Sequence, residues 1–250
     1  MRKMSTVLSR FPKRRMPLPP AYAAIYEEHY LINRNGQSAT TKLSQGMEGW
    51  LHRQVARDLD KQKRPVSTLE LGAGTLNQLA YEPECGPYDV VEPFTKLYEG
   101  SKHLERIRDV FTDISEVRGR TYDRITSVAV FEHITDLPLV VARSATMLKP
   151  GGSLRAAIPN EGTILWWLGT CLTGMAFRKR YGLSYARLME FEHVNTADDI
   201  GEVLECFFGS VKCRVRGLSK ALAFYRFYEA TLPRIEEAQR FIAAQPASRF

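Results

Sequence analysis

The sequence predicts a doubly wound α/β fold built on a mostly parallel, seven-stranded sheet. Short apolar runs alternate with segments of helical length, which implies right-handed crossovers and helices on both faces of the sheet. The run RPVSTLEL at 64–71 is typical of a buried strand, because a short apolar stretch with Val and Thr ends abruptly in glycine. The 250 residues, of which 44% are hydrophobic, suffice for one large domain with a modest appendage.

The other elements follow from the spacing of apolar residues. Apolar positions three and four apart predict two helices before any strand, at 21–34 and 42–62. Further strands are predicted at 88–93, 106–111, 122–131 and 152–159, with helices at 94–104 and 137–148. Two late segments, 211–219 and 221–230, resemble strands close enough in sequence to form a hairpin.

The predicted organisation is a basic tail and N-terminal helical cap at 1–64, followed by the ligand-binding domain at 65–250 with an inserted lid at 161–190. The first twenty residues carry six Lys or Arg and no acid, and they lack the apolar stretch of a secretory signal. We therefore expect a mostly disordered tail that ends at PLPP.

Charge and cysteine content limit the function less sharply. Much of the net charge of +7 lies in the tail and in clusters such as 178–180, so it decides little about partners. The four cysteines show no metal-ligand spacing and are few for a disulfide scaffold, which favours a reducing, cytoplasmic location and argues against a structural zinc site.

The turn LELGAG at 69–74 indicates the kind of ligand. In a doubly wound sheet, glycines after the first strand let a ligand approach the backbone, as at sites for NAD, FAD and nucleosides. A dinucleotide fingerprint needs a third glycine where Asn77 stands, and Glu70 would repel a pyrophosphate. The acid favours a cationic ligand such as S-adenosylmethionine, which carries a sulfonium and an ammonium but no phosphate.

Residues 65–232 resemble the class I S-adenosylmethionine-dependent methyltransferases of the small-molecule type, which have a Rossmann-like fold. Five segments follow in the order of that family, each at a strand end: LELGAG, DVVEP, FTDISEV, YDRITSVAVFEHITD and MLKPGGSLRAAIPN. The resemblance implies an enzyme with S-adenosyl-L-methionine as its cofactor.

The resemblance also implies which residues hold the cofactor. Glu70 would lie near its methionine end, and Glu92, twenty-two positions later, would accept from both ribose hydroxyls. Asp113 would accept from the adenine amino group. The remaining expected contacts are Gly72, Ala73 and Gly74 at the turn, Ile114 along the adenine ring, Val130 after the fourth strand, and Tyr30 from the N-terminal cap.

Each acid also has a purely structural alternative. Glu70 and Asp113 could cap a turn or a short helix, and Glu92 could lie on a solvated loop. Their occurrence together and in order is what favours the cofactor site.

The acceptor is predicted to be a small molecule. Adenine-amino methyltransferases carry an Asn/Asp-Pro-Pro-aromatic segment where this chain has VFEH, and cytosine-C5 enzymes need a cysteine there. In addition, no segment joins basic and aromatic residues as an RNA-binding appendage would, so nucleic acid is disfavoured. The FEH and EHVN segments resemble those of small-molecule enzymes.

Two histidines are candidates for the catalytic base. Alignment and exclusion of water promote methyl transfer, but a hydroxyl acceptor must also lose its proton. His193 and His133 can titrate near neutrality, and we favour His193 because it follows the segment where this family builds its acceptor pocket. The alternative for either is a structural bond to a carboxylate or a carbonyl. No catalytic metal is predicted.

The segment 161–190 is the most distinctive part outside the motifs. Its apolar stretch at 164–177 is too short to cross a bilayer. A lid over the acceptor is the first choice; a homodimer contact, or a peripheral membrane helix with Arg178, Lys179 and Arg180 on anionic headgroups, are the others. Three aromatic side chains suit stacking on a sugar or aromatic ring or, alternatively, buried packing: Trp166, Trp167 and Tyr181.

The sequence thus predicts methyl transfer to a hydroxyl, or less favourably an amine, of a small-molecule or glycan-type acceptor. One alternative is a lipid or quinone-type acceptor at a membrane surface. The alternative from another class is a module that binds S-adenosylmethionine without turning it over.

Overall fold

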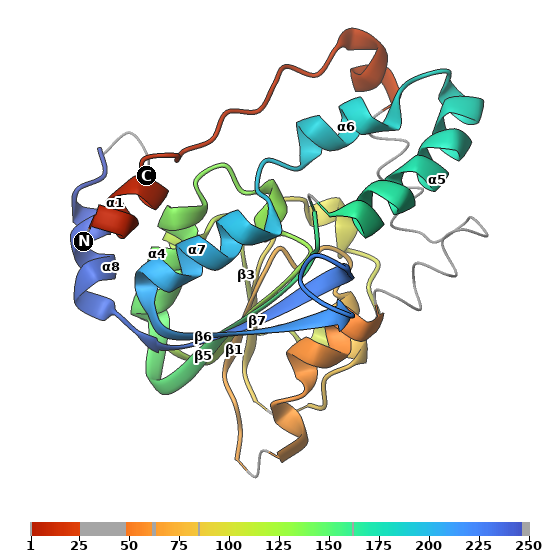
Figure 1. Cartoon of the computed structure of the whole chain (residues 1–250). Helices are drawn as coiled ribbons and strands as arrows, with labels where there is room; N and C mark the ends of the chain where they lie inside the picture. Colours follow the sequence, from red (N-terminus) through yellow and green to blue (C-terminus); the bar gives the residue numbers. More distant parts are fainter. Residues whose placement is uncertain (1, 26–48, 62–63, 85, 162, 247–250) are drawn as a thin grey trace.

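The computed structural model describes residues 2–25, 49–61, 64–84, 86–161 and 163–246, arranged around a seven-stranded sheet (Figure 1). The strand order is β3-β2-β1-β4-β5-β7-β6, and only β7 is antiparallel to its neighbours. The predicted fold class is confirmed. The order reverses between β1 and β4, which places the crevice for a ligand at the carboxyl ends of these strands.

The strands lie close to their predicted positions. They are β1 Thr68–Leu71, β2 Tyr88–Val91, β3 Asp109–Phe111, β4 Tyr122–Val128, β5 Leu148–Pro159, β6 Phe208–Gly217 and β7 Ala223–Pro233. The predicted C-terminal hairpin is the β6–β7 pair. The strand predicted at 106–111 is shorter, because residues 104–106 form a 3₁₀ turn instead.

The helices labelled in Figure 1 are α1 Arg2–Leu8, α4 Leu137–Met147, α5 Ile164–Tyr181, α6 Tyr185–Glu192, α7 Ala197–Phe207 and α8 Ile235–Ala243. Residues 20–25 and 49–56 are also helical. The helix predicted at 137–148 is confirmed. Of the two N-terminal helices predicted, 26–34 and 42–48 lie outside the described residues, and the second helix ends at 56 rather than 62.

The helix predicted at 94–104 is wrong. This segment holds only the 3₁₀ turns Thr95–Leu97 and Leu104–Arg106. Gly100 interrupts it, and glycine within a helix costs about 1 kcal/mol relative to alanine. The hydroxyl of the next residue, Ser101, donates to the Thr75 carbonyl at 3.2 Å, which ties the segment to the turn after β1.

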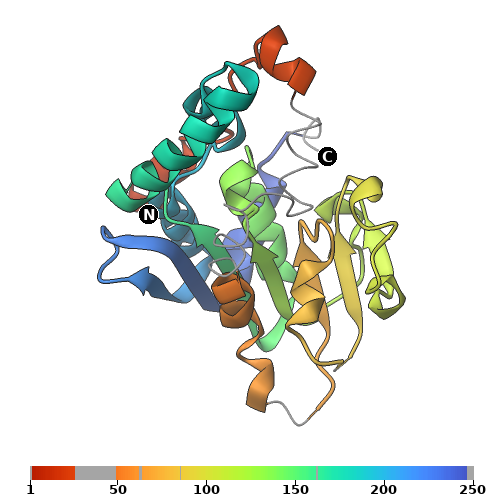
Figure 2. The same cartoon turned by 90° about the vertical axis from the view of Figure 1, so that its right-hand side faces the viewer.

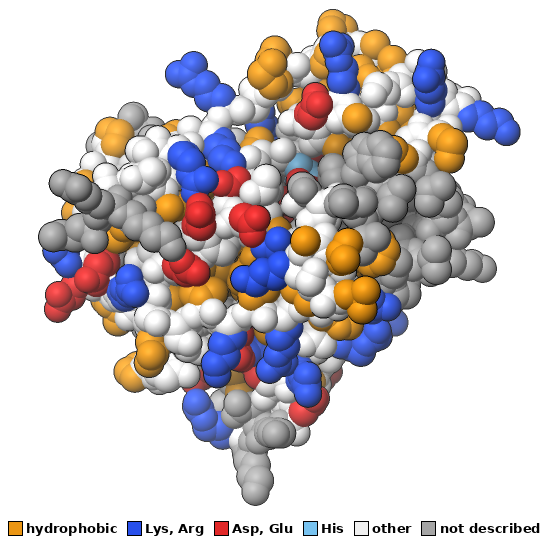
Figure 3. Space-filling model, in the orientation of Figure 1, with side chains coloured by type: hydrophobic (Ala, Val, Ile, Leu, Met, Phe, Trp, Pro, Cys, Tyr) orange, Lys and Arg blue, Asp and Glu red, His pale blue; other side chains and the backbone are white. Residues whose placement is uncertain are grey.

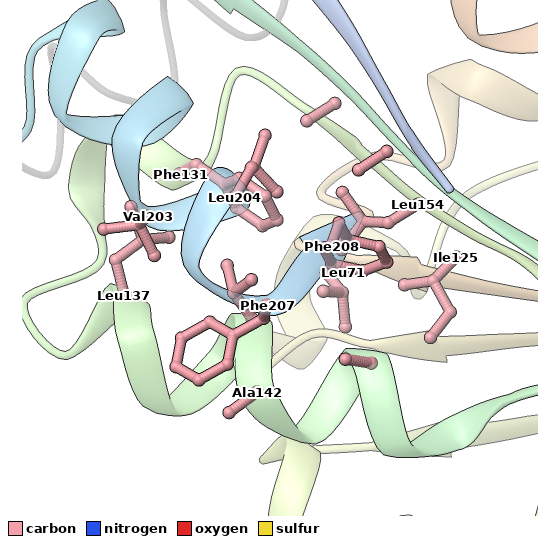
Figure 4. Close-up of a cluster of buried hydrophobic side chains, with 14 of the residues drawn as sticks. Leu71, Ile125, Phe131, Leu137, Ala142, Leu154, Val203, Leu204, Phe207 and Phe208 are labelled. Atoms are coloured by element: carbon pink, nitrogen blue, oxygen red, sulfur yellow. The ribbon is translucent and has the colours of Figure 1, made fainter. Parts of the chain in front are cut away.

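The main core lies on the sheet face that α4, α7 and α8 cover (Figures 1 and 4). The amphipathic helix α7 begins at a capping box, in which Thr196 and Asp199 exchange side-chain to backbone hydrogen bonds. Its apolar residues recur at helical spacing and meet side chains from the strands. Figure 4 shows this cluster, including Leu71, Ile125, Leu154, Val203, Leu204, Phe207 and Phe208.

The opposite face carries two buried arginines, Arg124 on β4 and Arg155 on β5, which are 1% and 2% exposed. Both donate to the Val55 carbonyl, at 2.9 and 2.8 Å. Arg155 also donates to the Gln54 carbonyl at 2.8 Å. These carbonyls end the helix at 49–56, where cations complement the helix dipole. The arginines therefore hold this helix against the sheet.

Acidic side chains surround the same two arginines. Asp58 lies 3.1 Å from Arg124 and 3.2 Å from Arg155. Glu82 accepts from Arg124 at 2.7 Å, and both of these side chains are 1% exposed. Glu229 of β7 contacts Arg155. The charges are thus paired inside the protein rather than solvated.

The prediction of a mostly disordered tail is wrong over the described residues. Helix α1 packs on the main core, where Val7 is 6% exposed. Lys13 then donates to Asp199 of α7 at 2.6 Å. The basic composition suggested disorder, but the apolar residues of the tail have the spacing of one helix face. They are Met4, Val7, Leu8 and Phe11.

The N-terminal segment then reaches the insertion at 161–190. Helices α5 and α6 stand away from the sheet, and the chain after α1 runs across to them (Figures 1 and 2). Tyr22 packs with Phe177, Leu188 and Met189, and its hydroxyl donates to the Ser184 carbonyl at 3.1 Å. Within the described residues no helix has the length and apolar character needed to span a membrane.

We expect Arg124→Met to destabilise the protein by about 3–5 kcal/mol, because Glu82, whose side chain is 1% exposed, would remain buried without its cation. Urea denaturation measures this loss. The matched control is Arg64→Met, which removes an arginine that is 68% exposed and paired with Asp123, and should cost less than about 1 kcal/mol. Equal losses in the two variants would contradict the structural role of Arg124.

Candidate active site

The turn after β1 can be built only with glycine at Gly72. Its φ is +69°, and a Cβ there would lie 2.4 Å from Cγ2 of Val130. Gly74 also has a positive φ, of +52°, and Ala73 between them is buried. The turn and the segment after β4 are therefore in such close contact that no side chain fits at Gly72.

Glu92 is fixed beside this turn. It follows β2, is 4% exposed, and accepts from the Gly74 amide at 2.8 Å and from the Phe94 amide at 2.9 Å. The solvated-loop alternative does not apply to it. A carboxylate held in this way at a strand end still has lone pairs for a further pair of hydroxyl donors.

Glu70 is buried on β1, two residues before Gly72. It is 2% exposed and accepts from the Tyr88 hydroxyl at 2.8 Å. Burial raises the pKa of Glu70 to about 8, and the neighbouring Glu82 acts in the same direction. The carboxyl is therefore mostly protonated at pH 7, and a cation bound nearby would lower this pKa.

Asp113 caps the 3₁₀ helix Ile114–Glu116, which is the structural alternative that the sequence offered for it. Its Oδ1 accepts from the Ser115 amide at 2.8 Å, and Glu116 completes a capping box. The side chain of Ile114 is buried in the main core. Asp113 and Ile114 therefore lie just after β3, in a loop whose conformation is fixed by the capping box.

Two copies of the tripeptide FEH meet at the end of β4. The first forms the 3₁₀ helix Phe131–His133, and the second, at 191–193, ends α6. The Val194 amide donates to the Glu132 carbonyl at 2.8 Å, and buried Asn195 donates to the carbonyls of Phe131 and Ile134 at 2.8 and 2.7 Å. The loops are thus joined backbone to backbone.

This junction brings the two candidate histidines together. The ring centroids of His133 and His193 are 4.6 Å apart at an interplanar angle of 69°. Nδ1 of His133 donates to the Glu192 carbonyl at 3.0 Å, because a carbonyl can only accept. His133 therefore makes the structural bond to a carbonyl that we gave as the alternative to a catalytic role.

His193 lies against a carboxylate, with Nδ1 in contact with Oε1 of Glu161. Burial lowers the pKa of His193 to about 3, and His133 and Arg15 act in the same direction, so the imidazole is neutral at pH 7. A carboxylate beside Nδ1 favours the tautomer with its proton on that atom. Nε2 then carries a lone pair that can accept a proton.

A cavity of about 1040 Å³ adjoins these two residues. Helices α5 and α6 supply most of its wall, so the insertion at 161–190 shapes the space beside His193. The wall includes Met175, Arg178, Leu183, Tyr185 and Met189. Tyr181 packs on Phe177, with centroids 5.0 Å apart, while Tyr30 and the side chains of Trp166 and Trp167 lie outside the described residues.

A family model described as a methyltransferase domain matches residues 42–205. The chain belongs to this family. It is therefore an S-adenosylmethionine-dependent methyltransferase, as its motifs predicted. A comparison with curated proteins found no match.

Solved structures support the fold of this methyltransferase. The plantazolicin methyltransferase BpumL in complex with SAH has a TM-score of 0.56 at 13% identity, over 92% of this chain and 95% of that one. An O-methyltransferase family protein from Burkholderia thailandensis gives 0.55 at 13%, over 92% and 68%. The CurJ carbon methyltransferase gives 0.54 at 19%, over 93% and 67%. At such identities the likeness shows the fold alone.

Sequence reasoning missed Glu161 and Asn195 of this methyltransferase. Glu161 follows the Pro159–Asn160 pair at the end of β5, and that strand end was the available signal. Asn195 completes the EHVN segment, of which only the histidine was singled out. In the described part of the chain, no group of three His, Cys, Asp or Glu side chains could hold a metal ion.

We expect Gly72→Ala to abolish binding of S-adenosylhomocysteine and to destabilise the fold by more than backbone strain alone. Gly119→Ala is the matched control, since Gly119 has φ +68° but an added Cβ there would meet nothing within 4 Å. The control should cost about 1–2 kcal/mol and leave binding intact. Adding Val130→Ala to Gly72→Ala should recover part of the difference. Calorimetry and thermal denaturation give both quantities, and equal effects of the two alanines would contradict the close contact.

Proposed function

We propose that this methyltransferase transfers a methyl group to a hydroxyl of a small-molecule or glycan-type acceptor. The observation that carries the proposal is the pair His193 and Glu161 beside the cavity between α5 and α6. An amine acceptor is less favoured, because a positioned neutral base is most useful where a hydroxyl must lose its proton.

The cofactor would bind across the carboxyl ends of β1, β2 and β3. Gly72, Ala73 and Gly74 would line its backbone cradle, since the two glycines carry no side chain that would hold a ligand away from the backbone. Glu92 would accept from the two ribose hydroxyls. The other proposed contacts are Glu70 toward the methionine end, Asp113 and Ile114 at adenine, Val130 behind the turn, and Tyr30 from the N-terminal cap.

His193 would act as the base. S-Adenosylmethionine supplies an electrophilic methyl group, so the protein's task is to orient the acceptor oxygen and take its proton. The neutral imidazole offers Nε2 for this purpose, while Glu161 holds the tautomer and stabilises the imidazolium that forms. His133, held by the Glu192 carbonyl, would orient His193 through their ring contact.

The insertion 161–190 would act as a lid. Its helices wall the cavity, and the N-terminal residues 18–25 pack on them, so the two segments together can exclude water from the reacting groups. In this proposal residues 65–250 form the catalytic domain, and residues 1–64 supply a docked helix and a cap rather than a free tail.

A lipid or quinone-type acceptor is the second candidate. The observation that favours it is the apolar part of the cavity wall, where Met175 is 64% exposed beside Leu183 and Met189. Such a wall suits a long apolar substituent on the acceptor.

We expect S-adenosylhomocysteine to bind, and Glu92→Gln to weaken it at least about tenfold, or 1.4 kcal/mol, through loss of a carboxylate oxygen that accepts from ribose. Isothermal titration calorimetry measures both affinities, and NADH serves as the competing ligand class. Glu99→Gln, at an exposed position after the same strand, should leave the affinity unchanged. An unaltered affinity in a folded Glu92→Gln protein would exclude the ribose contact.

We expect His193→Gln to lower kcat by about 10²- to 10⁴-fold while leaving the affinity for S-adenosylhomocysteine unchanged. The assay is the mass gain of one methyl group on a hydroxylated acceptor found by screening. Glu161→Gln should lower kcat less, and His103→Gln, in a turn after β2, should not lower it. Full activity of His193→Gln would rule out His193 as the base without touching the cofactor site.

A further inference from the structure

The β6–β7 hairpin forms the outer edge of the sheet and is strongly basic. Residues 206–228 contain no Asp or Glu. The buried Arg226 contacts Asp198. Of the remaining basic residues of the segment, Arg216 is half-buried and three are exposed: Lys212, Arg214 and Lys220.

The end of the same hairpin exposes large apolar side chains. Leu218 is 92% exposed, Leu222 41% and Phe224 38%. The Leu218 amide donates to the Leu222 carbonyl at 2.9 Å, which brings the two leucines to the same turn. Figure 3 shows hydrophobic side chains gathered over the end of the hairpin, with Lys and Arg side chains beside them.

The conformation of this turn is fixed from inside the protein. Asn160, which is fully buried at the end of β5, donates to the carbonyls of Lys220 and Ala223 at 2.7 and 2.8 Å. The Thr163 hydroxyl donates to the Ala223 carbonyl at 3.4 Å. The hydrogen bonds of buried Asn160 therefore fix the conformation of the apolar tip. Because the tip is already ordered, its binding to a partner would cost little conformational entropy.

We propose that the hairpin tip, residues 212–224, docks the protein on an anionic lipid bilayer. Leu218, Leu222 and Phe224 enter the interfacial region, while the surrounding Lys and Arg side chains meet the headgroups. A protruding turn fits a soft interface into which side chains can sink. The cations at its base complement an anionic surface, and the apolar tip distinguishes a bilayer from a polyanion bound by charge alone.

The first measurement is co-sedimentation of the full chain with vesicles. Vesicles of phosphatidylcholine with about one third phosphatidylglycerol should bind it, and vesicles of phosphatidylcholine alone should not. Added salt should weaken the binding, since headgroup attraction is screened. Absence of binding to the anionic vesicles would overturn the proposal.

Two variants and one control locate the contact. The double variant Leu218→Ser with Leu222→Ser, and the triple variant Lys212→Gln with Arg214→Gln and Lys220→Gln, should each weaken binding by about tenfold or more. The control removes as many exposed charges from α5 and α6: Lys179→Gln, Arg180→Gln and Arg187→Gln, with no comparable loss expected.

The outcomes separate the alternatives. Loss of vesicle binding in the control but not in the hairpin variants would move the contact to α5 and overturn the proposal. Binding to the anionic vesicles that depends on the hairpin's charges but not on its leucines would show that the apolar tip does not enter the bilayer, and would also overturn it. All substituted side chains are exposed, and thermal denaturation checks that each variant remains folded.

Discussion

The interaction on which the rest of the structure depends is the burial of Arg124 and Arg155 in the middle of the sheet. A guanidinium removed from water costs several kcal/mol unless acids and carbonyls surround it. Their partners come from parts of the chain far apart in sequence: the end of the helix at 49–56, Asp58, Glu82 and Glu229. The two arginines thereby fix where the helix at 49–56, the segment that carries Glu82 and the antiparallel strand β7 must lie. Gln78 extends this network, because it donates to Glu82 at 2.7 Å and lies 2.8 Å from the His52 ring.

This network also shows which features the spacing of apolar residues could predict and which it could not. The strands carrying Arg124 and Arg155 were predicted correctly, because their neighbours are apolar and end at turn residues. That the arginines point inward could not be predicted, since their partners are brought to them only by the fold. The same limit explains the tail: its many cations suggested a solvated segment, whereas Val7 is buried and Lys13 bonds to Asp199, whose position is set by α7.

The candidate site likewise contains residues whose positions could be predicted from the sequence and residues whose positions could not. The positions of residues that follow a strand could be predicted, because the carboxyl ends of parallel strands meet at one edge. Gly72 and Glu92 directly follow β1 and β2, and His133 lies in the turn after β4. His193 was predicted by its neighbours in sequence, and the structure brings it to His133. Glu161 was missed, because its contact with His193 exists only where the loop after β5 meets the end of α6. The repeated FEH tripeptide is not an internal repeat, but it marks two loops that bond to each other.

The environment of His193 sets opposing demands on a base. Burial keeps the imidazole neutral and able to accept a proton, but a pKa of about 3 also makes it a weak base on its own. In the proposed mechanism Glu161 would counter the second effect, because its carboxylate would stabilise the imidazolium once the proton arrives. Such a pair is effective only when proton removal accompanies methyl transfer and water is excluded. The N-terminal segment would serve this requirement, since Arg15 contacts the His133 carbonyl while Tyr22 is bonded to Ser184, the residue before α6. One segment thus ties the histidine pair and the wall of the cavity together.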